Sequence, residues 1–346
     1  MSAHGAAPGA AGAQAPGRTL PNGIAADGSA SPAPAASAIS RVSSAWLLAR
    51  SLTRPPAPRQ DTAARILNVT AEVYHSDPCD VPTLSASIAH LLVAESPRHA
   101  YVAHPRLGGG ISIGTRKNPQ LAGEILHRLI LGKGREIVAI AANDFRTARA
   151  QELRDTAFAD GRLPILTGEL EETAAFAGRV RDRCAALGFP FDGESEVAIE
   201  WSEPLADGNV RCRCMMDHVD LEHGRVYDLK RVADANPRRL ERTIVENGLD
   251  LQAHAYRRAL EALRPELVGR VEFTFLFVEA DAPHEIVPAV LDGRLREIGE
   301  LRWQRALRTW RECLTANRWP GYTDGRPALL EAQPWDVARE IGSVDL

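Results

Sequence analysis

The 346-residue sequence predicts an α/β (α+β) fold, in which a mixed central β-sheet is flanked by helices. Two changes of hydrophobic period support this prediction. Between residues 85 and 187 apolar side chains recur every three or four positions, as in helices, whereas between 196 and 230 they recur every second position, as in strands. Helical and strand patterns then alternate to residue 316. Because a helix and a sheet must each bury an apolar side, helices packed on a sheet are the natural arrangement.

Residues 1–60 are predicted to lie outside this fold as a disordered N-terminal tail. Residues 1–40 consist mainly of Ala, Gly, Pro and Ser, so they cannot bury enough apolar surface to offset the entropy lost on ordering. Residues 41–60 add a short apolar run and a proline-rich stretch. We predict one globular domain over 61–330 and a C-terminal tail over 331–346.

The first half of the globular part is predicted to be helical. The first of its helices has Ser85 as a candidate N-cap and Ile88, Leu91 and Leu92 as its apolar stripe. The predicted helices span 85–94, 119–131, 145–159 and 169–187.

A three-stranded meander follows, with turns that contain Gly208 and Gly224. The predicted strands span 196–201, 210–216 and 225–230. The tight turn at Gly224 makes the last two antiparallel neighbours. The remaining predicted elements are a helix at 249–263, a strand at 271–278 and a long arginine-rich helix at 291–316.

The composition argues against several classes of protein. No stretch is long and apolar enough to span a membrane, and the N-terminus lacks a signal-peptide pattern. Five scattered cysteines indicate a reducing, cytoplasmic environment, not a disulfide framework. No G-x-x-x-x-G-K-[ST] phosphate loop supports an ATPase. The formal net charge of −4 gives no sign of nucleic-acid binding, although bound cations and local arginine clusters can offset it.

The end of the meander carries residues suited to phosphodiester hydrolysis. Asp228 and Lys230 are two apart in a strand and share one face, and Asp217 is expected beside Asp228 on the neighbouring strand. Only three of the 41 basic residues are lysines, and arginine poorly replaces a compact ammonium beside a reacting water. Both carboxylates and the Leu229 carbonyl would suit Mg²⁺, with Mn²⁺ as a substitute. The alternative is a surface ion pair, because D-x-K alone is a weak signal.

Three further side chains are candidates with structural alternatives. Gln252 and Tyr256 share a helix face and could hydrogen-bond a DNA phosphate or the lysine, or pack a tyrosine in the core. His127 stands among apolar residues, and this pattern favours a buried core histidine.

Arginines supply the candidate DNA contacts. Arg213 shares the Asp217 face, whereas Cys212 and Cys214 lie on the opposite face and are interpreted as packing residues. Arg238 and Arg239 are candidates for gripping the DNA backbone, and the alternative is a solvated helix face.

Asp217, the triplet 228–230 and the Gln252…Tyr256 pair resemble the PD-(D/E)xK nuclease superfamily, specifically its RecB-like branch. The sequence is most similar to the exonuclease VIII (RecE-type) nuclease domains of phages and prophages. The resemblance covers about residues 74–322. It includes the segments 82–88, 95–97, 123–131, 144–147, 162–166, 312–313 and 319–322.

This resemblance implies a restriction-endonuclease-like core and Mg²⁺-dependent, ATP-independent 5′→3′ digestion of linear double-stranded DNA during recombination. It implies a homo-oligomeric ring acting at DNA ends with a RecT-like single-strand annealing recombinase as partner. It also assigns His127 to the metal site with Asp217 and Asp228, against the core interpretation, and a catalytic role to Lys230.

Two other functions remain open. The same fold hosts endonucleases and repair nucleases, so end-dependence is not fixed by the sequence. A non-catalytic DNA-binding subunit is the third possibility, and the intact set of Asp217, Asp228 and Lys230 argues against it.

Overall fold

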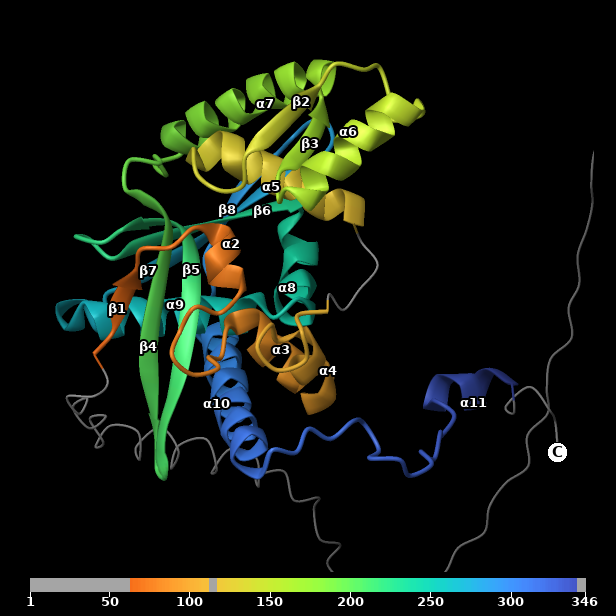
Figure 1. Cartoon of the computed structure of the whole chain (residues 1–346). Coiled ribbons are helices and arrows are strands. Elements are labelled where there is room, and N and C mark those ends of the chain that lie inside the picture. The colour runs from red at the N-terminus through yellow and green to blue at the C-terminus, as the bar shows by residue number, and fades with distance from the viewer. Residues whose placement is uncertain (1–62, 112–116, 341–346) are drawn as a thin grey trace, which may run out of the picture. The chain divides into compact units, whose positions relative to one another are not determined.

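A six-stranded mixed β-sheet forms the centre of the computed structural model, which describes residues 63–111 and 117–340 (Figure 1). In spatial order the strands are β1 (Arg65–Leu67), β4 (Glu194–Leu205), β5 (Gly208–Asp220), β6 (Arg225–Val232), β7 (Glu272–Glu279) and β8 (Ile286–Ala289). All neighbours are antiparallel except β6 and β7, which are parallel. The predicted α/β fold with a mixed sheet is therefore confirmed. The predicted tail at 1–60 lies outside the described residues.

The meander from β4 to β6 is present, with strands longer than predicted. Its two turns use glycines in conformations that other residues rarely adopt, with φ of +137° at Gly208 and +74° at Gly224. The β5–β6 pair is antiparallel, as the tight turn at Gly224 predicts.

The parallel β6–β7 pair needs a crossover, which α8 (Pro237–Glu246) and α9 (Leu249–Leu263) provide. The predicted helix at 249–263 corresponds to α9, whereas α8 was not predicted. Pro237 occupies the first turn of α8, and the Asn236 side chain caps it by accepting a hydrogen bond from the Arg238 amide.

One large core packs the sheet against helices α3 (Ala86–Ala94), α8, α9 and α10 (Gly293–Ala316). Trp201 of the sheet stacks on Trp303 of α10, with ring centroids 6.1 Å apart. α9 and α10 approach closely at Gly299, where a Cβ would stand 2.2 Å from the Asp250 carbonyl oxygen. Helix α4 (Pro97–Ala103) packs against α3 and α10.

A second core joins β6 and β7 to helices α5 (Lys117–Leu131) and α7 (Thr167–Ala186). Figure 1 shows these helices grouped with α6 (Ala148–Ala159) and with a parallel two-stranded sheet. That sheet consists of β2 (Ile137–Ile140) and β3 (Leu163–Leu166). α5 is thereby held over β6, which brings a histidine of α5 to the sheet.

The remaining elements are short: α2 (Ala71–His75), a 3₁₀ turn at Pro265–Leu267 and α11 (Pro334–Glu340). Among the described residues, no helix is long and apolar enough to cross a membrane.

Candidate active site

The candidate site lies where β5 and β6 stop pairing. Their ladder ends at His218↔Tyr227, while β6 stays paired with β7 through Val232. Asp217 and Asp228 would form the next pair in this register, so the structure brings the two carboxylates together. Beyond this point β6 has a backbone edge that β5 does not cover.

At this edge, side chains take the place of β5 as hydrogen-bond partners of the Leu229 backbone amide and carbonyl. The Leu229 amide donates to Asp217 Oδ2 at 2.8 Å, and the Leu229 carbonyl oxygen lies 2.7 Å from His127 Nε2. His127 Nε2 also lies 3.5 Å from Asp217 Oδ2. His127, which the apolar pattern alone assigned to the core, therefore points at the candidate site and remains partly exposed.

Asp228 is buried and held from two sides. The Gln252 side-chain amide, on α9, donates to Asp228 Oδ1 at 2.6 Å, and the Lys230 ammonium forms an ion pair with Asp228 Oδ2. Only 1% of the Asp228 side chain is exposed, against 28% for Lys230, so the lysine reaches from the buried carboxylate to the surface of the site.

The buried charges shift one another. Burial raises the pKa of Asp228 to about 6, with the Asp217 charge acting in the same direction and Lys230 opposing it. Burial by itself would lower the pKa of Lys230, but Asp228 and Asp217 outweigh that cost and raise it. A buried carboxylate beside a second carboxylate is an arrangement common at sites that bind or process charged groups.

Tyr256 lies one helical turn after Gln252 and is half-buried. Its ring packs edge-on against Phe273, with centroids 6.0 Å apart. Burial raises the pKa of its phenol well above the usual value, and Asp228 and Asp217 are close enough to add to this shift. Tyr256 therefore packs against the core and also lies near the carboxylates of the candidate site.

Glu196 of β4 belongs to this region, and the sequence interpretation missed it. It stands between the pairs Ser195↔His218 and Val197↔Met216, directly across from Asp217. Burial raises the pKa of Glu196, Asp217 acts in the same direction, and His127 opposes both. In the sequence it is one of several acidic residues at a strand start, and no spacing rule distinguishes it.

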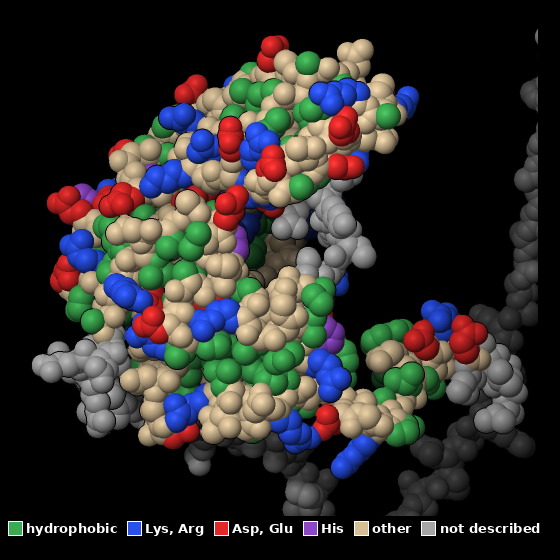
Figure 2. Space-filling model, viewed as in Figure 1, with side chains coloured by type: hydrophobic (Ala, Val, Ile, Leu, Met, Phe, Trp, Pro, Cys, Tyr) green, Lys and Arg blue, Asp and Glu red, His purple; other side chains and the backbone are tan. Residues whose placement is uncertain are grey.

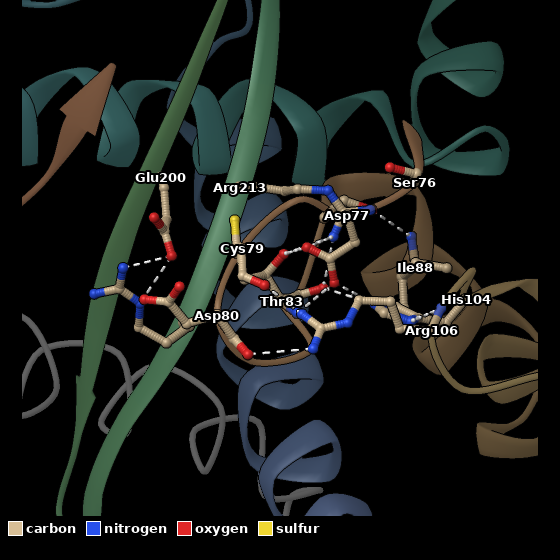
Figure 3. A network of polar contacts seen from close by, with 12 residues as sticks. Ser76, Asp77, Cys79, Asp80, Thr83, Ile88, His104, Arg106, Glu200 and Arg213 are labelled. Carbon is tan, nitrogen blue, oxygen red and sulfur yellow. Dashed lines mark hydrogen bonds and ion pairs between the residues drawn. The ribbon is translucent and has the colours of Figure 1, made fainter. Parts of the chain in front are cut away.

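Arg213 has a different environment from the one predicted. Its side chain is only 4% exposed and forms an ion pair with Asp77 Oδ1 at 3.1 Å, and it donates to Thr83 Oγ1 at 2.6 Å (Figure 3). This burial leaves no surface for a phosphate contact. The predicted DNA-binding role of Arg213 is therefore corrected to a structural one. Cys212 and Cys214 are buried in the main core.

Arg213 belongs to a network, called here the Asp77 network, of Asp77, Thr83, His104 and Arg213. Thr83 donates to both Asp77 oxygens, from its amide at 2.9 Å and its hydroxyl at 2.7 Å, and His104 Nε2 lies 3.2 Å from Asp77 Oδ2. Although burial opposes it, these contacts lower the pKa of Asp77 to about 2. Figure 3 shows the loop at 77–83 wrapped around this carboxylate beside β5.

Arg238 and Arg239 lie on the exposed first turn of α8. Arg239 forms an ion pair with Asp234. Both remain accessible, as a backbone contact requires.

A cavity of about 610 Å³ adjoins the candidate site at Glu196. Its wall mixes basic and acidic side chains. Figure 2 shows the molecule hollowed between the part that contains α5–α7 and the rest. Its lining residues include Arg128, Lys133, Gly134 and Glu196.

The donors at β6 fit a hard divalent cation. Neighbouring ligands of octahedral Mg²⁺ are separated by about 3 Å, and His127 Nε2 lies at 2.7 Å from the Leu229 carbonyl oxygen and 3.5 Å from Asp217 Oδ2. Within residues 63–111 and 117–340, no group of three His, Cys, Asp or Glu side chains is already assembled. Asp228, the fourth candidate ligand, is engaged by Lys230 and Gln252.

Comparisons with known proteins agree with this geometry. Residues 163–328 match the family model described as a PDDEXK-like domain of unknown function (DUF3799), so this part of the chain is similar to that domain. The matched segment contains Asp217, Asp228 and Lys230, whereas His127 precedes it. No curated protein sequence matches the chain.

Solved structures support the fold. A crystal structure named as a "putative exonuclease" from Eubacterium rectale is similar with a TM-score of 0.52 at 12% identity, covering 79% of this chain and 99% of that one. At this identity the likeness shows the fold alone. The structure named SSO0001 has a TM-score of 0.23 at 12% identity, covering 56% of this chain and 88% of its own, and carries no argument.

Proposed function

We propose that this protein is a divalent-metal-dependent, ATP-independent exodeoxyribonuclease that degrades linear double-stranded DNA in the 5′→3′ direction. The observation that carries the proposal is the convergence of Asp217, Asp228 and Lys230 where β6 leaves β5, with the Leu229 carbonyl among them. The match of residues 163–328 to a PDDEXK-like domain supports a nuclease of this kind.

The residues divide the chemistry between them. Asp217, Asp228, His127 and the Leu229 carbonyl would hold Mg²⁺ or Mn²⁺. Such a cation supplies positive charge that polarises a phosphoryl oxygen and lowers the pKa of water. Lys230, paired with Asp228, orients the attacking water and offsets negative charge developing on the phosphate. Gln252 fixes the Asp228 carboxylate by its hydrogen bond, and Tyr256 fills the adjoining helix face.

The decisive experiment compares DNA with and without ends. End-labelled linear duplex and a covalently closed circle are incubated with Mg²⁺ or with EDTA, for the wild type and for Asp228→Ala. Glu222→Ala, an exposed acidic residue of the β5–β6 turn, is the matched control. We expect metal-dependent loss of the linear DNA only, absent in Asp228→Ala and unchanged in the control. The position of the label gives the polarity.

The other functions predict different results. Cutting of the closed circle would identify an endonuclease or repair nuclease on the same fold. Retained DNA binding without cleavage of either substrate would identify a non-catalytic DNA-binding subunit, against the proposal.

Arg238 and Arg239 are proposed to bind phosphates of the DNA backbone. Each lost phosphate contact should reduce the slope of log affinity against log salt by about 0.9. The double variant Arg238→Ala/Arg239→Ala should therefore flatten that slope by about 2, measured by fluorescence anisotropy in the presence of Ca²⁺. An unchanged slope would remove these residues from the DNA interface.

The resemblance of the sequence to exonuclease VIII supports two further proposals. The protein would act in phage-type recombination with a RecT-like annealing recombinase as partner, and it would assemble as a homo-oligomeric ring. Light scattering of the purified full-length chain tests the assembly, and a monomeric mass would exclude the ring.

A further inference from the structure

Glu196 is held in an unusual backbone conformation beside the candidate site. Its φ is +52°, in the left-handed region that residues other than glycine seldom occupy. It stands on β4 directly across from Asp217, between the pairs Ser195↔His218 and Val197↔Met216. Opposed residues in an antiparallel pair lie close together, and the Asp217 charge acts on Glu196. Strained residues of this kind persist only where surrounding contacts fix them, and they concentrate at functional sites.

The loop between α5 and β2 makes room for the Glu196 carboxylate. A Cβ on Gly134 would stand 2.8 Å from Glu196 Oε1, closer than real Cβ atoms approach, so only glycine permits this placement. Lys133, which precedes Gly134 in the chain, donates from Nζ to the Ser195 carbonyl oxygen at 2.9 Å, and this bond fixes the backbone just before Glu196. The loop therefore holds the strand and places the Glu196 carboxylate against Gly134.

The charge of Glu196 has no direct partner in the described part of the chain. Neither a hydrogen bond nor an ion pair engages its carboxylate there, and Lys133 is occupied by the Ser195 carbonyl. Its charged neighbours are Asp217, of like charge, and His127, Lys133 and Arg128, which favour the ionised carboxylate without bonding to it. Two adjacent carboxylates repel each other unless a cation lies between or beside them.

We propose that Glu196 is an additional cation-binding residue of the active site, contributing a third carboxylate beside those of Asp217 and Asp228. This inference rests on the proposed metal-dependent function and extends it by one residue. Glu196 also lines the cavity next to the site, so a cation near it can be reached from solvent and by a phosphate of the substrate. Gly134 is the residue that positions this carboxylate.

Cation binding without DNA tests the proposal independently of cleavage. Mn²⁺ is titrated into the metal-free, full-length protein in a calorimeter, for the wild type, Glu196→Gln and Gly134→Ala. We expect Glu196→Gln to weaken Mn²⁺ binding by about 10–100-fold, the range typical of losing a residue that supports a metal site. Gly134→Ala should weaken it in the same direction, because the added Cβ displaces the carboxylate.

Two matched controls separate this role from folding. Glu194→Gln removes an exposed carboxylate two residues earlier on β4, and Gly132→Ala places a Cβ at another positive φ in the same loop with no atom within 4 Å. Neither control should change the affinity. In EDTA the Tm of Glu196→Gln should equal or exceed that of the wild type, while its rise on adding Mn²⁺ shrinks.

The outcomes are distinguishable from failure of the proposed function. If the wild type binds Mn²⁺ and Glu196→Gln binds it equally well, this inference is overturned and the nuclease proposal stands. If the wild type binds no Mn²⁺ at all, both are overturned. Weakening confined to Glu196→Gln and Gly134→Ala supports the inference.

Discussion

Two polar clusters lie along the same strand and have opposite electrostatic character. Arg213 and Asp217 are four residues apart on β5, and each belongs to a group that contains a histidine, an aspartate and a cation. In the Asp77 network, the pKa of Asp77 is lowered to about 2 by His104, Arg213 and Thr83 against the effect of burial. At the candidate site, burial dominates and the pKa of Asp228 is raised to about 6.

The difference lies in how completely each carboxylate is satisfied. Asp77 accepts from the Thr83 amide and hydroxyl and contacts both His104 and Arg213. At the candidate site Asp217 and Asp228 share the Lys230 ammonium, and Glu196 adds a third carboxylate next to Asp217. A buried charge with all its hydrogen-bond and ion-pair partners stabilises the fold. An excess of negative charge, in contrast, favours the binding of a cation.

The largest expected effect concerns Lys230, the proposed catalytic cation of the candidate site. Lys230→Ala should lower single-turnover cleavage of linear duplex by about 10²–10⁴-fold, since it removes the group proposed to orient the water. Lys230→Arg, which keeps the charge but not the compact ammonium, should recover little of the rate. Rapid-quench kinetics measure this, with Mn²⁺ titration as a check that the metal site persists. Normal turnover in Lys230→Ala would exclude the proposed role.

A matched pair of substitutions tests stability against function. Asp77→Asn should lower the free energy of unfolding by about 3 kcal/mol, because it leaves the buried Arg213 without its counter-ion. Asp217→Asn, which keeps an acceptor for the Leu229 amide, should cost less than about 1 kcal/mol in EDTA yet abolish cleavage. Urea denaturation followed by circular dichroism gives both values. Equal losses in the two variants would contradict the division drawn between the clusters.

A smaller effect should appear as pH dependence. The pKa of Asp77 falls from 3.8 to about 2 on folding. A depressed folded-state pKa contributes stability above the unfolded value, and that contribution is lost as pH falls through the folded one. It amounts to about 2 kcal/mol, because each tenfold change in proton affinity between the folded and unfolded states is worth about 1.4 kcal/mol.

Comparison with Asp77→Asn isolates this contribution. The stability difference between wild type and variant should shrink by about 2 kcal/mol between about pH 5 and about pH 2. Asp220, whose pKa is also lowered to about 2, is present in both proteins and therefore cancels. A difference that stays constant with pH would show that the Asp77 carboxylate is not the titrating group.

Much of the fold follows from local patterns in the sequence. The strands of the meander and helix α9 were predicted because each has a clear period and glycine-containing turns. β2 and β3, of four residues each, were not, because such short apolar runs have no measurable period. Helix α8 was missed because half of its residues are charged and its buried residues are Leu240 and Ile244 alone.

Some residues of the candidate site could likewise be predicted from the sequence, and others could not. Asp217, Asp228 and Lys230 could be placed together from strand alternation and one tight turn, and the structure brings them together. Arg213 could not be placed correctly, because the loop that covers it is about 130 residues earlier in the chain, the separation from Thr83. Glu196 was missed because its importance depends on Gly134, whose lack of a side chain matters only in three dimensions.

The hydrogen bond between the Leu229 amide and Asp217 makes this amide a spectroscopic probe of the candidate site. The amide proton of Leu229 bonds to a carboxylate of the candidate site, although its residue sits inside a strand where a backbone partner is usual. Its chemical shift and its exchange with solvent deuterium therefore report on Asp217 directly. Nitrogen-15 labelling of leucine would follow occupancy of the site through one resonance, without DNA and without turnover.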